Sequence, residues 1–197
     1  MSEPNGSPVR TAPAAVAVFG DGPLSKAVGI AVAGVRCTAP AACVVATVPP
    51  PAPLQELSDI HLSNDVAAAL AAVLAWVQQA LDTMSEGGGR LVFLLPYAPL
   101  LGAPGCVAPS AVTNGVLSMA RTLAIELARD QISVNVLAID DNRLLDEGLH
   151  ERGDVGRDGV AGVLATQLAA LLGPDGGEIT GQEIYLTAGS DLGRLHP

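Results

Sequence analysis

The residues with the clearest potential for chemistry lie in a glycine-containing turn near the start of the chain. The turn consists of Gly20-Asp21-Gly22-Pro23-Leu24-Ser25 and follows a short apolar run. This GxGxxS pattern differs by one residue from the GxGxxG of dinucleotide-binding turns, in which glycines let the backbone approach a pyrophosphate. Asp21 would bring a carboxylate near the phosphates, Pro23 removes a donor, and Ser25 replaces the third glycine. Nucleotide binding at Gly20, Gly22 and Ser25, and a tight turn without a ligand, both stay open.

Hydrolase and metal chemistry have less support in the sequence. A serine hydrolase needs a GxSxG turn and an oriented histidine, and this sequence contains no GxSxG. His61, His150 and His196 are expected in loops or at the terminus. His150 with Glu147 and Glu151 could ligate a metal, but charges around a lone loop histidine are usually just solvated, so no metal site is predicted. Cys37, Cys43 and Cys106 form no CxxC pair and are expected to be buried thiols.

Composition limits the classes of function. The chain has 197 residues, 49% hydrophobic, with 15% charged residues, a net charge of −10 and one lysine, Lys26. This composition excludes disorder throughout, and the negative charge opposes binding to nucleic acid or anionic membranes. Residues 1–13 are polar, are predicted to form a disordered tail, and contain no signal peptide. The apolar stretch Val66–Trp76 is too short to span a membrane, so a cytoplasmic protein is predicted, with residues 14–197 as one domain.

The order of expected elements indicates an α/β fold. Short apolar runs bounded by glycine or proline are expected to be buried strands, and segments with apolar residues at helical spacing are expected to be helices. The expected strands are Ala14–Phe19, Ala42–Val48, Leu91–Leu95, Ile132–Ala138 and Gln182–Leu186, and the expected helices are Leu24–Val35, Asp65–Met84 (with Ser63 or Asn64 as N-cap), Ala111–Arg129 and Gly159–Leu172. Continuous apolar strands that alternate with helices favour a parallel sheet covered on both faces. The predicted fold is a three-layer sandwich around a shortened, Rossmann-like sheet of about five strands.

Four segments between residues 88 and 189 resemble the short-chain dehydrogenase/reductase family. They are GGRLVFLL at 88–95, SAVTNGVLSMARTLAIEL at 110–127, ISVNV at 132–136 and ITGQEIYLTAG at 179–189. Their order and spacing match the family's strand before the catalytic serine, its catalytic and dimer-forming helix, its strand ending in VN, and its C-terminal TGQ strand. The resemblance covers most of residues 14–190 and implies an NAD(P)-dependent oxidoreductase fold.

The family's catalytic residues are replaced in this sequence. The resemblance places the catalytic serine at Pro96, the catalytic tyrosine at Pro109 and the catalytic lysine at Thr113. Proline has no proton to transfer and threonine carries no charge to lower a neighbouring pKa. Tyr97 could act as a substitute acid but has no lysine at the required spacing. The Pro-Gly pair that follows the VN strand in the family is Ile139-Asp140 here.

The sequence also has an internal deletion relative to the family. Only about 30 residues separate the helix ending near Val35 from the one starting at Asp65, where the family has two further βα units. The Ala42–Val48 run resembles the family's fourth strand. The family's second and third strands, which border the adenosine half of the cofactor, would then be missing from this chain. Right-handed crossovers then require either that the first helix changes face or that Ala42–Val48 takes the second-strand position.

The helix Ala111–Arg129 is apolar nearly all round, which favours a partner subunit on its second side. The residues predicted for this interface are Val112, Val116, Leu117, Ala120 and Ala124. The favoured function is a non-catalytic subunit that assembles with an active family member in a heterodimer or heterotetramer, with no cofactor on this chain and NAD(P) on the partner. The alternatives are a divergent NAD(P)-dependent reductase active by itself, and a small-ligand binding protein that uses the remnant cleft at the strand ends.

Overall fold

The computed structural model describes residues 15–84, 87–146 and 159–192, and its five strands form one parallel sheet in the order β1-β2-β3-β4-β5. The strands are β1 (Val16–Phe19), β2 (Ala41–Val45), β3 (Gly89–Pro96), β4 (Ile132–Ile139) and β5 (Glu183–Leu186). All of β2 and β4 and nearly all of β3 are buried, while the edge strands β1 and β5 are half-buried. Burial on both faces explains why the central strands are continuous apolar runs.

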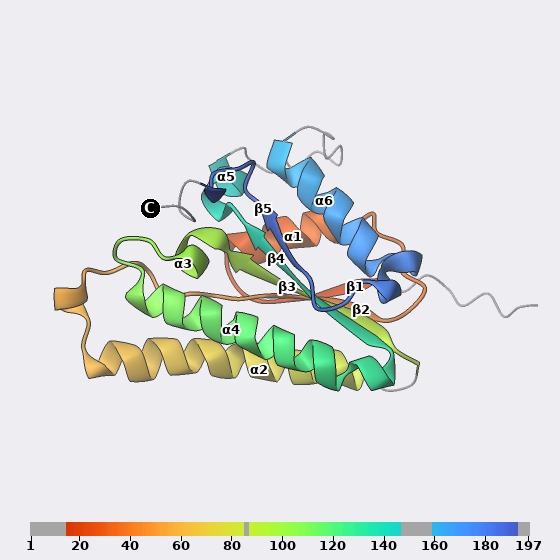
Figure 1. The fold of residues 1–197 in the computed structure, drawn as a ribbon, viewed down its shortest axis with the longest axis horizontal. Coiled ribbons are helices and arrows are strands. Elements are labelled where there is room, and N and C mark those ends of the chain that lie inside the picture. Colours follow the sequence, from red (N-terminus) through yellow and green to blue (C-terminus); the bar gives the residue numbers. More distant parts are fainter. Residues whose placement is uncertain (1–14, 85–86, 147–158, 193–197) are drawn as a thin grey trace, which may run out of the picture.

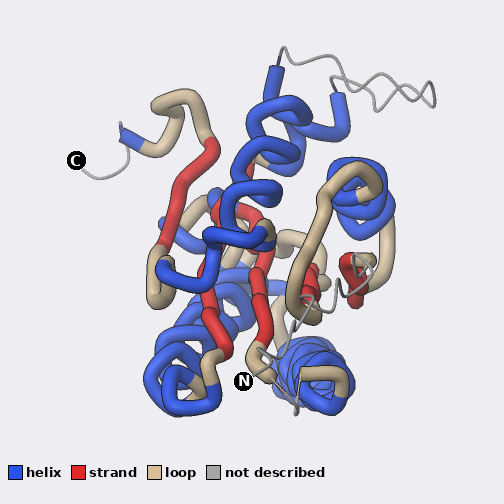
Figure 2. Tube along the Cα trace, turned by 90° about the vertical axis from the view of Figure 1, so that its right-hand side faces the viewer, coloured by secondary structure: helices blue, strands red, loops and turns tan. Residues whose placement is uncertain are grey.

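Helices cover both faces of the sheet, which confirms the predicted three-layer fold (Figure 1). On one face lie α1 (Pro23–Val32), α5 (Asp141–Asp146) and α6 (Gly159–Leu172); on the other lie α2 (Ala67–Asp82), α3 (Tyr97–Leu101) and α4 (Val107–Glu126). Figure 2 shows the strands running between these helices. Shorter helical turns are η1 (Leu54–Glu56), the π-helical η2 (His61–Val66), η3 (Ala128–Asp130) and η4 (Pro174–Glu178).

Alternation along β3 divides the core into two apolar clusters. Leu91, Phe93 and Leu95 pack with the inner faces of α2 and α4, whereas Val92 and Leu94 pack with α1 and α6. All five side chains are fully buried. Because neighbouring residues of a strand point to opposite faces, one strand supplies both layers of the core.

Several local predictions needed correction. Ser63 does not cap the helix at 65, because the helical backbone already begins before it, and the Ser63 hydroxyl donates back to the carbonyl of Asp59 at 2.8 Å. The short helices α3 and α5 lie between the expected strands and helices, in segments for which no helix was predicted. Cys37, Cys43 and Cys106 are buried free thiols, as predicted. The predicted tail, residues 1–13, and the candidate metal ligands around His150 lie outside the described residues.

The connections between strands do not all have the same hand. Each step from β1 to β5 moves to the next parallel strand in one direction, yet α1 and α6 cross one face while α2 and α4 cross the other. Two of the four crossovers are therefore left-handed, although about 98% of such connections are right-handed. From the sequence we expected either that α1 would move to the other face of the sheet or that β2 would lie on the far side of β1. Neither occurs, because α1 shares its face with α6 and β2 lies between β1 and β3. The apolar side of α1 packs against strand β2 and α6, and this burial outweighs the preference for hand.

Candidate functional site

The carboxyl ends of the five parallel strands meet at one edge of the sheet, where ligands bind in open α/β folds. Gly20 follows β1, Pro96 ends β3, Asp140 follows β4, and Thr187 follows β5. The first turns of α4 adjoin this edge, because Ser110 donates to the Pro99 carbonyl at 2.7 Å and so joins α4 to α3. The positions that the family resemblance assigns to catalysis and cofactor binding therefore belong to one region.

The three catalytic positions contain no ionisable side chain and no positive charge. Pro96 is buried at the end of β3, opposite Ile139 of β4. Pro109 is the third residue of α4, where its missing N–H breaks no intrahelical hydrogen bond. Thr113 is 0% exposed, and its hydroxyl lies 3.1 Å from the Pro109 carbonyl and 3.3 Å from the Ser110 carbonyl. The hydroxyl at the lysine position thus bonds to its own helix and faces the core.

Tyr97 is not arranged like a substitute catalytic acid. It begins α3, is only 8% exposed, and belongs to the apolar cluster beneath α2 and α4. The single lysine of the chain, Lys26, lies on α1, on the opposite face of the sheet. The sheet therefore separates the tyrosine from the only lysine, and a Tyr–Lys pair of the family type does not form.

Gly20 and Gly22 have different roles in the first turn. Gly20 has φ +135°, and a Cβ there would lie 2.6 Å from the carbonyl oxygen of Val45 in β2. Gly22 precedes α1 with φ +88°, and a Cβ there would meet nothing within 4 Å. Ser25 is half-buried in the first turn of α1, next to Pro23, which has no N–H. A role in packing β1 against β2 explains Gly20, and nucleotide binding at Gly20, Gly22 and Ser25 stays a prediction.

Replacement of Gly20 by alanine is expected to lower the free energy of unfolding by about 2 kcal/mol or more, because the positive φ and the backbone of Val45 both oppose a Cβ. Gly29→Ala is the matched control: Gly29 lies inside α1 with open space around it, so alanine should add about 0.5–1 kcal/mol. Urea unfolding of both variants measures these changes. Equal stability of the Gly20 variant and the native chain would contradict the packing role.

In the described residues, the carboxyl ends of the strands carry acidic side chains, and no strand lies beyond β1 to line an adenosine site. Because β1 is the edge strand, the described part of the chain places no strand outside it. Asp140 and Asp141 follow β4, and burial raises the pKa of Asp141, with a smaller contribution from the charge of Asp140. The hydroxyl of Thr187 donates to the carboxylate of Asp191, which is itself buried. Such an edge repels a pyrophosphate. Within the described segments, no group of three or more histidine, cysteine or acidic residues could hold a metal ion.

The residues predicted for an interface on α4 are already covered within this chain, and an interface through them stays a prediction. Val112, Val116, Leu117, Ala120 and Ala124 are all buried within this chain, where they pack in the cluster between α4 and the sheet. Periodicity identified both apolar sides of α4, but it could not show that strand β4 and α2 of the same chain already cover them. Gly115 illustrates this packing, because a Cβ there would lie 3.1 Å from Leu70 of α2.

The exposed apolar surface on this side of the molecule lies mainly on α2. We call it the α2/α4 outer face, defined by Leu62, Ala67, Ala71, Leu74 and Ala75 around α2 together with Val107 and Ile125 of α4. Leu74 is 47% and Ile125 is 79% exposed. The sequence could have predicted this surface, because Ala67–Ala75 contains no polar residue and a helix over these residues must expose apolar side chains.

By length and composition, the continuous helix His61–Asp82 could also cross a membrane, with a mean hydropathy of 1.2 and only 17% of its apolar window buried. The apolar run Val66–Trp76 is shorter than this helix, and its length had predicted no membrane span. In the structure α2 lies along α4 and packs on the sheet through Val73, Val77 and Ala80, as one layer of the α/β fold (Figure 1). That packing is typical of a globular domain, and the cytoplasmic location stays a prediction.

Comparison with known families agrees with this fold. Residues 41–191 match the family model described as enoyl-(acyl carrier protein) reductase. The chain therefore belongs to the short-chain dehydrogenase/reductase family, and within it to a form whose sheet has five strands. The match begins at β2, so β1 and the glycine turn lie outside the part that the model recognises.

Individual relatives are more distant. The chain is 28% identical over 150 residues to 1-cyclohexenylcarbonyl-CoA reductase of Streptomyces collinus, a match that covers 70% of this chain and 53% of the relative. The chain thus matches only about half the length of this curated relative. Among solved structures, acetoin dehydrogenase of Enterobacter cloacae has TM-score 0.61 and 22% identity over 76% of this chain and 64% of that one. Levodione reductase has TM-score 0.59 and 20% identity over 76% and 66%. These likenesses show the fold.

Proposed function

We propose that this chain is a non-catalytic subunit that assembles with, and stabilises, an active short-chain dehydrogenase or ketoreductase. The observation that carries the proposal is the content of the three catalytic positions, Pro96, Pro109 and Thr113, which have no ionisable side chain, and the Thr113 hydroxyl bonds to its own helix. The fold around them is intact, with five paired strands and both helix layers. Retention of the fold without the catalytic groups fits selection for assembly rather than for turnover.

The α2/α4 outer face is the surface that we assign to the partner. In the family resemblance, the counterpart of α4 packs across a two-fold axis, and α2 lies beside α4 in this structure. The assigned partner is an active family member that presents the corresponding pair of helices, in a heterodimer or heterotetramer. NAD(P) would bind to that partner, since on this chain the adenosine side is an open sheet edge and the carboxyl edge carries Asp140 and Asp141.

Co-purification from the native source tests this function. The tagged chain should bring down, at equal stoichiometry, a dehydrogenase that keeps the serine, tyrosine and lysine, and intact-complex mass spectrometry gives the stoichiometry. Reductase activity should require the partner and be absent from this chain alone. Since both named sequence matches carry an acyl-carrier or CoA term, the assays should include an enoyl-CoA and a 3-oxoacyl-CoA. Recovery of this chain only with copies of itself would contradict the proposed hetero-oligomer.

A divergent reductase active by itself remains the competing function, and binding of NADPH separates the two. Titration followed by NADPH fluorescence should show no saturable binding to the isolated chain, because the carboxyl edge is acidic and the Tyr97 and Lys26 side chains lie on opposite sides of the sheet. Micromolar binding together with turnover by the isolated chain would favour the enzyme.

A further inference from the structure

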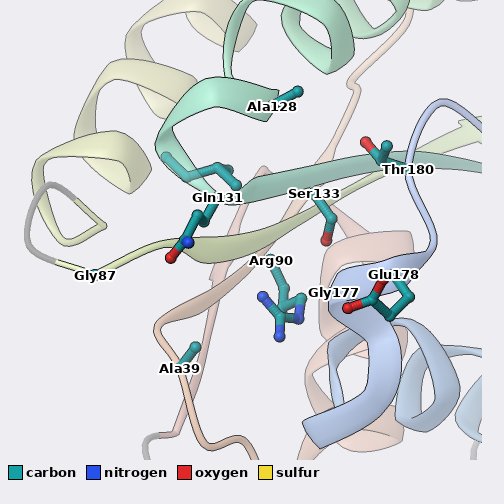
Figure 3. Close-up of a pocket in the computed structure, with 10 residues that line it drawn as sticks. Ala39, Gly87, Arg90, Ala128, Gln131, Ser133, Gly177, Glu178 and Thr180 are labelled. Atoms are coloured by element: carbon teal, nitrogen blue, oxygen red, sulfur yellow. The ribbon is translucent and has the colours of Figure 1, made fainter.

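A pocket lies at the amino ends of β3 and β4, at the opposite edge of the sheet from the catalytic positions (Figure 3). Its volume is about 440 Å³, and the residues that line it include Arg90, Gln131, Ser133, Gly177, Glu178 and Thr180. Arg90 and Pro96 are six residues apart on β3, which corresponds to about 20 Å. The pocket is therefore separate from the region where the family binds its cofactor, and it does not depend on the function proposed above.

The register of the sheet places two polar side chains together in this pocket. Arg90 of β3 is paired with Ser133 of β4, so their side chains project from the same face and are neighbours. Further along the same face, the two strands carry Val92, Leu94 and Leu137, which are fully buried core residues. At the amino ends of β3 and β4, this face therefore presents a guanidinium and a hydroxyl where the rest of the face presents apolar side chains.

Both polar groups have buried atoms without a hydrogen-bond partner among the described residues. These atoms are Nε of Arg90 and Oγ of Ser133, and Ser133 is only 3% exposed. Asn135, the next polar residue of β4 on this face, shows the usual arrangement: its amide donates to the Ile179 carbonyl at 2.7 Å and its oxygen accepts from the Gln182 N–H at 3.0 Å. Native proteins rarely leave buried polar atoms unsatisfied, because each one costs about 1–3 kcal/mol.

The only hydrogen bond of the Arg90 guanidinium within the described residues is made by Nη1. Nη1 of Arg90 donates to the Gly89 carbonyl at 3.1 Å. The group lies against Gly177, where a Cβ would be 2.6 Å from Nη2 and 2.8 Å from Cζ, so a side chain at this position would displace the guanidinium. In the described residues no acceptor meets the edge formed by Nε and Nη2. This edge is the one with which arginine binds carboxylates and phosphates in a bidentate manner.

We propose that this pocket binds the carboxylate or phosphate group of a small organic anion, through the Nε–Nη2 edge of Arg90 and the hydroxyl of Ser133. The volume falls within the range of small-molecule sites, so it leaves room for an organic part beyond the anionic group. The ligand would supply the acceptors that both buried donors lack. Glu178, an exposed residue of the pocket wall, makes no ion pair with Arg90 within 4.0 Å, and its charge lowers the affinity for an anion.

Calorimetric titration of the full chain tests the site, with inorganic phosphate and succinate as probes at constant ionic strength. Saturable binding of either probe at millimolar concentration or tighter is expected; phosphate alone indicates a phosphate ligand, and succinate alone or more tightly indicates a carboxylate. Arg90→Met should weaken binding at least about tenfold, since a charge-assisted hydrogen bond contributes about 1.5–3 kcal/mol. Arg143→Met, which removes an exposed charge on α5 at the carboxyl ends of the strands, is the matched control and should leave the affinity within about twofold of the native chain.

Two further variants distinguish a ligand site from a structural role. Ser133→Ala should weaken binding about tenfold without lowering the melting temperature of the ligand-free chain, because the hydroxyl has no partner to lose. Glu178→Gln should tighten binding about threefold by removing a competing charge. No saturable binding to the native chain, or equal binding to the Arg90 and Arg143 variants, would overturn the proposal. Binding seen only with Glu178→Gln would also overturn it, because Arg90 would then be paired with Glu178.

Discussion

Replacement of Thr113 by lysine, which restores the family's residue at this position, is expected to lower the free energy of unfolding by about 4 kcal/mol at pH 7. Thr113 is fully buried in the apolar cluster between α4 and the sheet. Burial disfavours the charged form of a lysine and lowers its pKa well below the unfolded value of about 10.4. In an active family member, by contrast, the resemblance implies that the lysine faces the cofactor.

The pH dependence of the Thr113→Lys variant gives the sign of this effect. Because the pKa of the lysine is lower in the folded than in the unfolded state, the penalty is absent above about pH 10.4 and grows as the pH falls toward the folded pKa. Urea unfolding at pH 7 and pH 9.5 measures it, with Thr113→Val as the control of similar size, which should lose less than about 1.5 kcal/mol. A lysine variant as stable as the native chain at pH 7 would mean that position 113 opens to solvent, which would restore the case for an enzyme.

Replacement of Leu74 by glutamate is expected to dissociate the complex with the partner, weakening the affinity by at least about a hundredfold. Leu74 lies midway along α2, belongs to the α2/α4 outer face and is about half exposed in the isolated chain. Burial of an unpaired carboxylate in an apolar interface costs several kcal/mol, whereas the same change on an exposed surface costs little. The fold of the chain should therefore survive while its assembly is lost.

Ile30→Glu is the matched control for the Leu74 variant. Ile30 lies on α1, on the opposite face of the sheet, is 37% exposed, and acquires the same charge. Co-purification yield and light scattering after gel filtration should separate the two variants, with Ile30→Glu assembling like the native chain. If the isolated native chain is a stable monomer and both glutamate variants still bind the partner, the α2/α4 outer face is not the interface.

The sequence predicted much of the fold because each strand and each long helix has its own pattern of apolar residues. Short, largely apolar runs predicted all five strands to within a few residues, and Gly159–Leu172 was predicted with the bounds that the structure gives. The same local signals could not show the hand of the crossovers, because hand depends on which layer buries α1. They also could not show that Val116 and Ala120, predicted for an interface, are buried within this chain, because only the packed structure shows what covers them.

The sequence by itself determined the family, the parallel three-layer fold and the chemical content of the catalytic positions, because those follow from residue types and their order. Tertiary structure alone decided how residues distant in the sequence meet. It buried Thr113 in the core, put Tyr97 and Lys26 on opposite sides of the sheet, and paired Arg90 with Ser133. The physical reason is that register and layer order are set by the total apolar surface that the whole chain can bury, which no single segment specifies.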